Sequence, residues 1–370
     1  MIKKARIGEN TIKKSYFTNE EEVFMQDDDF SVSTFLYESG VPSIKIKNNK
    51  GYVEILPFNG QMIWDVVFGG RSLKMKSPFA MPRNVDSFLD TYGCYLMHCG
   101  VLAMGSPGPE DKHPLHGELP YASYDSANLI SGFDEKEKFI SVTGVYEYNR
   151  AFGDHYIAKP EVKLYADSTI LDVTIAIENL SNYPMEMMYM CHINNRPVVG
   201  GKIMQSFSWD LHGMELRQSI PKHIKISETF QKFLQNIGKD YALTSVIRED
   251  STYDPEIVFF LKNPMIDKSG WTHLMQVHPD GSADYVGYKP EELDHASRWI
   301  VRNKNMEALG LALPATADAE GYTAEKKKGN IKTIKPSGIF TAHLKVGYLE
   351  GKSTSEMIET INSLKRHIEK

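Results

Sequence analysis

The chain has 370 residues, of which 41% are apolar and 24% charged, and its formal net charge is −6. This composition is typical of a globular protein. The negative charge argues against nucleic acid or an anionic membrane as a partner, because phosphate binding needs clustered Lys and Arg. Three cysteines provide no disulfide framework, and we see neither a signal peptide nor an apolar run long enough to span a membrane. We therefore expect a cytoplasmic protein.

Alternation of apolar and polar side chains is the dominant pattern along the chain. Residues 44–47 and 52–56 alternate on either side of an Asn-Asn-Lys-Gly turn, which predicts a β-hairpin. The same period of two recurs at 61–68, 139–148, 170–178 and 340–348. Because successive side chains of a strand point to opposite faces, each of these segments can cover a core with one face.

Helical periodicity is scarce. One candidate covers residues 228–238, and the clearest is the tail, where apolar residues recur at three- and four-residue spacing up to Ile368. Strands do not alternate with helices, which argues against βαβ architecture. We therefore predict an all-β protein with few short helices. A single large, mostly antiparallel β-sandwich would cover residues 1–350, and a C-terminal helix over 351–370 would pack on it.

Two histidine segments are the candidates for chemistry. The first is a loop over 106–120, in which prolines and glycines fix an irregular backbone that could present His116 to a ligand; the alternative is an ordinary loop histidine. The second is a strand over 185–196, apolar on both faces at first and then polar at His192 and Asn194. Such a strand would be covered on both sides, with His192 at the edge of a cavity. The alternative is a core histidine whose ring hydrogen-bonds to a neighbouring backbone group.

A metal site is a third interpretation of the loop. His113, His116 and Glu118 lie close in sequence, with His98 upstream, and His and Glu are zinc ligands. This arrangement would suggest a metal-dependent sugar isomerase. Pro114 directly follows His113, which argues against convergence of the side chains, and we expect no metal. The chain also lacks the short glycine-rich motifs that bind nucleotides.

Three stretches, in this order, carry a resemblance to a known family: Pro114-Leu115-His116-Gly117, Met190-Cys191-His192-Ile193-Asn194, and Gly310-Leu311-Ala312-Leu313-Pro314-Ala315-Thr316. Together they resemble the aldose 1-epimerase (galactose mutarotase-like) superfamily, and most closely its uncharacterised bacterial aldose 1-epimerase-like branch. The match extends over roughly residues 30–350. The resemblance implies a galactose mutarotase-like supersandwich whose concave face binds a monosaccharide.

The resemblance also implies a reaction, mutarotation, in which a base takes the proton of the anomeric hydroxyl while an acid protonates the ring oxygen. This reaction needs no cofactor, in keeping with the absent nucleotide motifs, and we expect none. Both groups must titrate near neutral pH, which suits a histidine and a carboxylate. By position, His192 would be the general acid and His116 would hydrogen-bond the sugar near the ring oxygen. The family's base is a glutamate, and its equivalent here is Leu313. We expect Asp318 or Glu320 to substitute, with Glu118 a weaker candidate that could also bind the sugar.

The expected sugar-binding residues are Arg83 or Arg71, Asn194 and Asp280, with Lys74, Lys76, Arg196 and Trp299 as weaker candidates. Several cations in one pocket would favour an acidic sugar or a sugar phosphate, because arginine binds carboxylate and phosphate in two-point fashion. The leading hypothesis is therefore an aldose 1-epimerase-like isomerase of an unidentified monosaccharide or acidic sugar. The alternatives are a non-catalytic carbohydrate-binding protein on the same scaffold and the metal-dependent isomerase. The expected partner is a small-molecule sugar, and a homodimer is compatible with the sequence.

Overall fold

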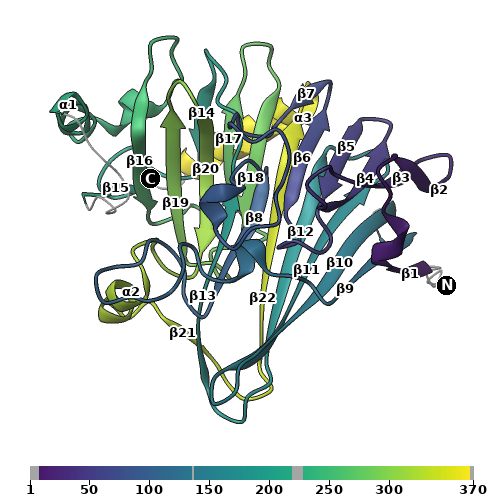
Figure 1. Ribbon diagram of the computed structural model, residues 1–370. Coiled ribbons are helices and arrows are strands. Elements are labelled where there is room, and N and C mark those ends of the chain that lie inside the picture. The colour runs from purple at the N-terminus through teal and green to yellow at the C-terminus, as the bar shows by residue number, and fades with distance from the viewer. Residues whose placement is uncertain (1–7, 136, 219–227, 367–370) are drawn as a thin grey trace.

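Two large antiparallel sheets form the body of the structure, a computed structural model that describes residues 8–135, 137–218 and 228–366 (Figure 1). The nine-stranded sheet has the order β1 (Gly8–Ile12), β9 (Ser126–Phe133), β10 (Lys138–Asn149), β11 (His155–Tyr165), β12 (Ile170–Asn179), β22 (Ile339–Leu349), β18 (Ala283–Tyr288), β17 (Thr272–Val277) and β14 (Lys202–Gln205).

The second sheet has thirteen strands. Its order is β15 (Met214–Leu216), β16 (Tyr253–Leu261), β19 (His295–Arg302), β20 (Glu307–Ala315), β13 (Met185–Ile193), β8 (Leu96–Val101), β6 (Ile63–Phe68), β5 (Gly51–Ile55), β4 (Pro42–Asn48), β3 (Ser31–Leu36) and β2 (Glu22–Gln26). Two short strands complete it: β7 (Arg71–Ser72) pairs with β6, and β21 (Lys332–Ile334) pairs with β13. The predicted all-β, antiparallel architecture is confirmed.

Helices are few, as predicted. They are α1 (Glu228–Ile237), α2 (Tyr322–Lys328), α3 (Lys352–Arg366) and the short 3₁₀ segments Lys14–Tyr16, Phe88–Asp90, Leu119–Tyr121 and Tyr241–Thr244. On α3, Ile361 is buried in a small apolar cluster with Leu349 and Tyr285. The predicted helical residue Ile368 lies outside the described residues. Within the described part of the chain, no helix combines the length and the apolar character needed to cross a membrane.

The alternation of side chains gives the thirteen-stranded sheet two apolar faces. On β13, Tyr189 and Cys191 join the main core, which also takes side chains from the nine-stranded sheet. Met188 and Met190 instead belong to a second apolar cluster on the other face of the strand. Loops cover this second face, and they contribute Phe88 and other apolar side chains to the same cluster. A period of two therefore places the even-numbered residues of β13, His192 among them, beneath these loops.

Candidate functional site

A cavity of about 230 Å³ opens between the thirteen-stranded sheet and its covering loops. This volume is slightly below the roughly 300–1,000 Å³ of pockets for drug-sized ligands, and so suits a smaller molecule. Its lining is mostly apolar, with a few polar groups. The lining residues are Phe88, Leu89, Tyr92, Ser106, Leu115, His116, Met190, His192, Arg217, Pro255, Glu256, Val258, Ser297, Trp299, Val301, Asn303, Met306, Leu313 and Ala319.

His192 lies at the C-terminal end of β13, on the cavity wall, and its side chain is almost completely buried. Its Nδ1 lies 2.8 Å from Oδ1 of Asn194. The same amide oxygen accepts a hydrogen bond from the Tyr92 hydroxyl at 3.0 Å. Burial lowers the pKa of His192 to about 4, because a charged imidazole is poorly solvated there. The imidazole is therefore neutral at pH 7.

His116 reaches the cavity from the loop that follows β8. Its backbone has φ = 61°, and the next residue, Gly117, has φ = 82°. A side chain at Gly117 would meet the carbonyl oxygen of Ala103 at 2.2 Å, so the tight loop requires glycine at this position. This turn brings the His116 ring edge-to-face against the ring of His192, with 5.2 Å between the centroids. The two histidines singled out from the sequence therefore meet in one cavity.

An indole and an ion pair complete the polar part of the cavity wall. The Trp299 ring lies 5.3 Å from the His192 ring, again in an edge-to-face arrangement. Its Nε1–H donates to Oε2 of Glu256 at 2.6 Å, and Arg217 donates to Oε1 at 2.5 Å. Each carboxylate oxygen of Glu256 thus has a donor. Of these residues, Trp299 was a weaker candidate from the sequence, and no sequence pattern had indicated Glu256 or Arg217.

The signal for Glu256 was present but weak. Glu256 and Val258 are two residues apart on β16 and line the same cavity, as alternation along a strand requires. Nothing in the sequence indicated that β16 adjoins β19, which carries Trp299, in the same sheet. Arg217 directly follows β15, which pairs with β16 on the side opposite β19. No local sequence pattern indicated Arg217 as a cavity residue.

Asp318 and Glu320, the expected substitutes for the family's catalytic glutamate, lie outside the cavity lining. Leu313 does line the cavity, which fits its position in the late Gly-Leu stretch. The Lys328 ammonium forms ion pairs with Asp318 at 2.9 Å and with Glu320 at 3.0 Å. Neither carboxylate lines the cavity, whereas Ala319 between them does.

Glu118 has a structural position. Its Oε1 accepts hydrogen bonds from the backbone N–H groups of Val101 and Leu102, at 2.8 and 3.0 Å, and from the Tyr156 hydroxyl at 2.6 Å. These contacts anchor the loop at the end of β8. They hold the carboxylate outside the cavity lining, so the structure does not bring Glu118 together with the two histidines.

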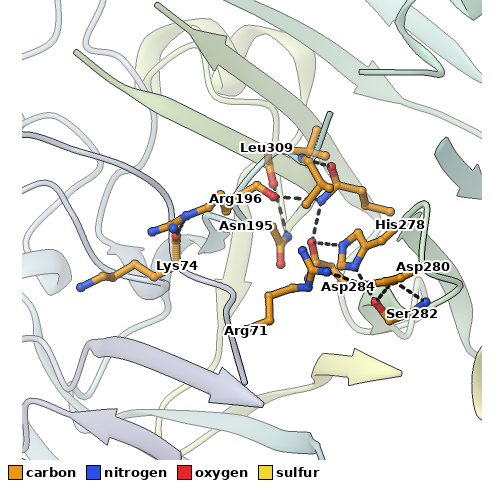
Figure 2. A network of polar contacts seen from close by, with 11 residues as sticks. Arg71, Lys74, Asn195, Arg196, His278, Asp280, Ser282, Asp284 and Leu309 are labelled. Atoms are coloured by element: carbon orange, nitrogen blue, oxygen red, sulfur yellow. Dashed lines mark hydrogen bonds and ion pairs between the residues drawn. The ribbon is translucent and has the colours of Figure 1, made fainter. Parts of the chain in front are cut away.

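Arg71 and Asp280, both expected to bind the sugar, bind each other instead, at 2.6 Å (Figure 2). Figure 2 shows the network that continues from this pair through Ser282 and His278 to Asp284. It links β7 of one sheet to the turn between β17 and β18 of the other.

Arg83 likewise does not line the cavity, since its side chain lies over the Phe79 ring. Asn194 contacts His192 and is itself fully buried.

The arrangement needed for the metal interpretation is not present. His113 Nδ1 lies 2.8 Å from the carbonyl oxygen of Pro114, and its Nε2 lies 3.6 Å from Asp111. His116 lies in the cavity against His192, whereas Glu118 contacts Val101, Leu102 and Tyr156 outside the cavity lining. Among the residues that the structure describes, no three His, Cys, Asp or Glu side chains form a group that could hold a metal ion.

Solved structures share this architecture. A "putative aldose 1-epimerase" from Klebsiella pneumoniae subsp. pneumoniae MGH 78578 is similar over 97% of this chain and 96% of its own, with a TM-score of 0.80 and 15% identity. A galactose mutarotase-like protein from Clostridium acetobutylicum is similar over 88% and 100%, with a TM-score of 0.60 and 14% identity. One from Lactobacillus casei ATCC 334 is similar over 83% and 99%, with a TM-score of 0.53 and 13% identity.

At these identities the likeness is one of fold, and it confirms the galactose mutarotase-like sandwich that the resemblance implied. No curated protein matches the sequence. A sequence family does match residues 38–347, most of the chain, and its description is "Domain of unknown function (DUF4432)". The chain therefore belongs to the DUF4432 family and has a galactose mutarotase-like fold.

Proposed function

We propose that the chain is an aldose 1-epimerase-like isomerase that opens and recloses the ring of a monosaccharide in the cavity. The observation that carries this proposal is the edge-to-face contact of His116 and His192 on one cavity wall, at 5.2 Å between ring centroids. Ring opening needs one group to take the anomeric proton and another to donate a proton to the ring oxygen. Two imidazoles beside one ligand can divide these tasks between them.

The rest of the cavity suits a sugar. Trp299 offers an aromatic surface for the C–H groups of the ring, and Glu256 and Arg217 offer an acceptor and a donor for hydroxyls. Small-molecule sites typically combine such an apolar lining with a few polar groups that orient the ligand. Because Glu256 already neutralises Arg217, the cavity favours a neutral monosaccharide over an acidic sugar or sugar phosphate.

Anomer exchange across a panel of sugars, followed by NMR, tests the proposal. We expect wild-type protein to accelerate exchange for at least one sugar. We expect His192→Ala to slow it by about 10²- to 10⁴-fold, the usual contribution of a group that transfers a proton. Equal rates for wild type and variant would remove His192 from the mechanism, and exchange at the buffer rate for every sugar would refute the proposed activity.

One observation favours a second candidate function, non-catalytic carbohydrate binding. Leu313 occupies the position where the resemblance expects a base, and the nearby carboxylates Asp318 and Glu320 are paired with Lys328. For this function, calorimetry would show a sugar binding to the protein while anomer exchange stays at the buffer rate. Exchange that depends on His192 would exclude it.

A further inference from the structure

The hydrogen bonds around His192 determine which of its ring nitrogens carries a proton. The Asn194 amide is oriented by its Nδ2–H, which donates to the carbonyl oxygen of Cys94 at 3.1 Å. Its Oδ1 therefore faces Tyr92, whose hydroxyl donates to it, and Nδ1 of His192 at 2.8 Å. An amide oxygen only accepts hydrogen bonds, so Nδ1 must be the protonated nitrogen.

The other nitrogen, Nε2, is then the one available to a ligand. A neutral imidazole carries a single N–H, so Nε2 of His192 has a free lone pair. The ring lines the cavity, and Nδ1 is turned toward Asn194. In the part of the chain that the structure describes, no residue hydrogen-bonds to Nε2. A ligand hydroxyl can therefore donate to this nitrogen.

The surroundings favour the neutral ring. The groups that face it are the imidazole of His116, the phenol of Tyr92 and the indole of Trp299. Among the described residues that line the cavity, the charged ones other than the histidines are Glu256 and Arg217, and they are paired with each other. Burial accordingly lowers the pKa of His192 to about 4. An imidazole that is neutral at pH 7 is able to accept a proton and has none to give from Nε2.

We propose that His192 is the base of the reaction, with Asn194 and Tyr92 as positioning residues that hold its tautomer. This inference rests on the proposed function and reverses the role of general acid that the resemblance implied for His192. It also explains how the site can do without the carboxylate that Leu313 replaces.

The proton transfers balance within the cavity. Nε2 of His192 takes the proton of the anomeric hydroxyl, and the electron pair of that O–H bond forms the C1=O bond. The bond between C1 and the ring oxygen breaks, its electron pair moves to the ring oxygen, and an N–H of His116 supplies the proton there. After rotation about C1–C2, the two transfers run in reverse and restore both imidazoles. Because a base of low pKa is weak, we expect the contribution of His192 near 10²-fold, the lower end of the usual range.

The tautomer can be measured without any substrate. Full-length protein labelled with ¹⁵N-histidine should show, at pH 7, a neutral His192 with its proton on Nδ1, and the His192→Gln variant would assign the signal. We expect Asn194→Asp to increase the imidazolium fraction at pH 5, because a carboxylate beside Nδ1–H favours the charged ring. A neutral ring protonated on Nε2, or an imidazolium in wild type at pH 7, would overturn the proposal.

The pH profile of anomer exchange tests the role. For a base, wild-type activity should stay constant above pH 6 and fall only toward pH 4. Asn194→Asp should move this acidic limb upward by about 1–3 pH units, the usual effect of an adjacent opposite charge. Tyr92→Phe, which removes a donor without adding charge, is the matched control and should leave the limb in place.

Two outcomes would contradict the role. A faster reaction of Asn194→Asp at pH 5 would identify His192 as the acid, and an unmoved limb would show that Asn194 does not position the imidazole. If wild-type protein exchanges no sugar at all, the proposed function fails and the base role fails with it. The ¹⁵N spectrum would still report the tautomer in that case, so a wrong tautomer and a wrong function give different results.

Discussion

His192 and His278 are both buried histidines close to the end of a strand, and each contacts a side chain farther along the chain. Around His278, Nδ1 lies 2.8 Å from Ser282 and Nε2 lies 3.2 Å from Asp284, so both nitrogens have protein partners (Figure 2). Around His192, the residues that the structure describes provide a partner for Nδ1, Asn194, and none for Nε2, and the ring lines a cavity. The Ser-His-Asp series at His278 resembles a catalytic arrangement in residue types, yet its hydrogen bonds lie within the β17–β18 hairpin and use both ring nitrogens. The difference shows that an unused ring nitrogen beside a cavity, more than the residue types around a histidine, marks a candidate site.

Replacing each of the two histidines by alanine should give the largest difference between the two regions, measured as the loss in free energy of unfolding. We expect His278→Ala to lower the free energy of unfolding by about 3 kcal/mol or more, because it takes from the buried Asp284 side chain one of its two hydrogen-bond partners and leaves Ser282 without its own. The corresponding loss for His192→Ala should be about 1–3 kcal/mol, since the hydrogen-bond partner that loses the imidazole is the neutral Asn194 amide. Urea unfolding of the two variants measures both values. A larger loss for His192→Ala would invert the comparison.

Acid should destabilise the protein through its buried neutral histidines. Burial lowers the pKa of both His192 and His98 to about 4, compared with about 6.5 for an unperturbed histidine. Between these values the unfolded chain binds a proton that the folded chain does not. Stability is therefore complete above pH 6.5 and falls by about 1.4 kcal/mol per pH unit for each histidine down to pH 4, about 3 kcal/mol each in total.

Unfolding free energies between pH 4 and 7 would test this prediction, with His98→Asn as the comparison. Because the variant lacks one of the two buried histidines, its unfolding free energy should fall less steeply with decreasing pH, by about 1.4 kcal/mol per pH unit. A slope that stays the same in His98→Asn would mean that this imidazole is already protonated in the folded protein.

The Arg71–Asp280 ion pair, at the exposed end of the network around His278, should contribute least to stability. Arg71 and Asp280 are about one-third and one-half exposed, and such pairs are usually worth about 0–1 kcal/mol. We expect Arg71→Ala to change stability by no more than this and to leave the affinity for a sugar that binds in the cavity unchanged. Calorimetry of the variant decides the second point. A clear loss of sugar affinity would restore Arg71 to the binding role that the sequence suggested.

The sequence by itself determined the all-β architecture and marked His116 and His192 as candidate site residues. Both conclusions rest on local patterns, because the alternation of side chains along a strand can be recognised within one short segment. The faces of β13 could be assigned from residues 187–194 alone, and the structure has the same two faces. The loop at His116 was also readable, because a left-handed turn with little room needs a residue such as Gly117. A local pattern of this kind predicts which way a side chain points, although not what it meets.

Only the tertiary structure decided which polar groups converge. Glu256 and Arg217 reach the cavity because β15, β16 and β19 are adjacent in one sheet, and strand order depends on contacts between residues far apart in the sequence. For the same reason, Asp318 and Glu320 could not be assigned to Lys328, nor Arg71 to Asp280, before the sheets were assembled. A charged residue is recognisable from sequence, whereas its partner is set by packing across the whole fold.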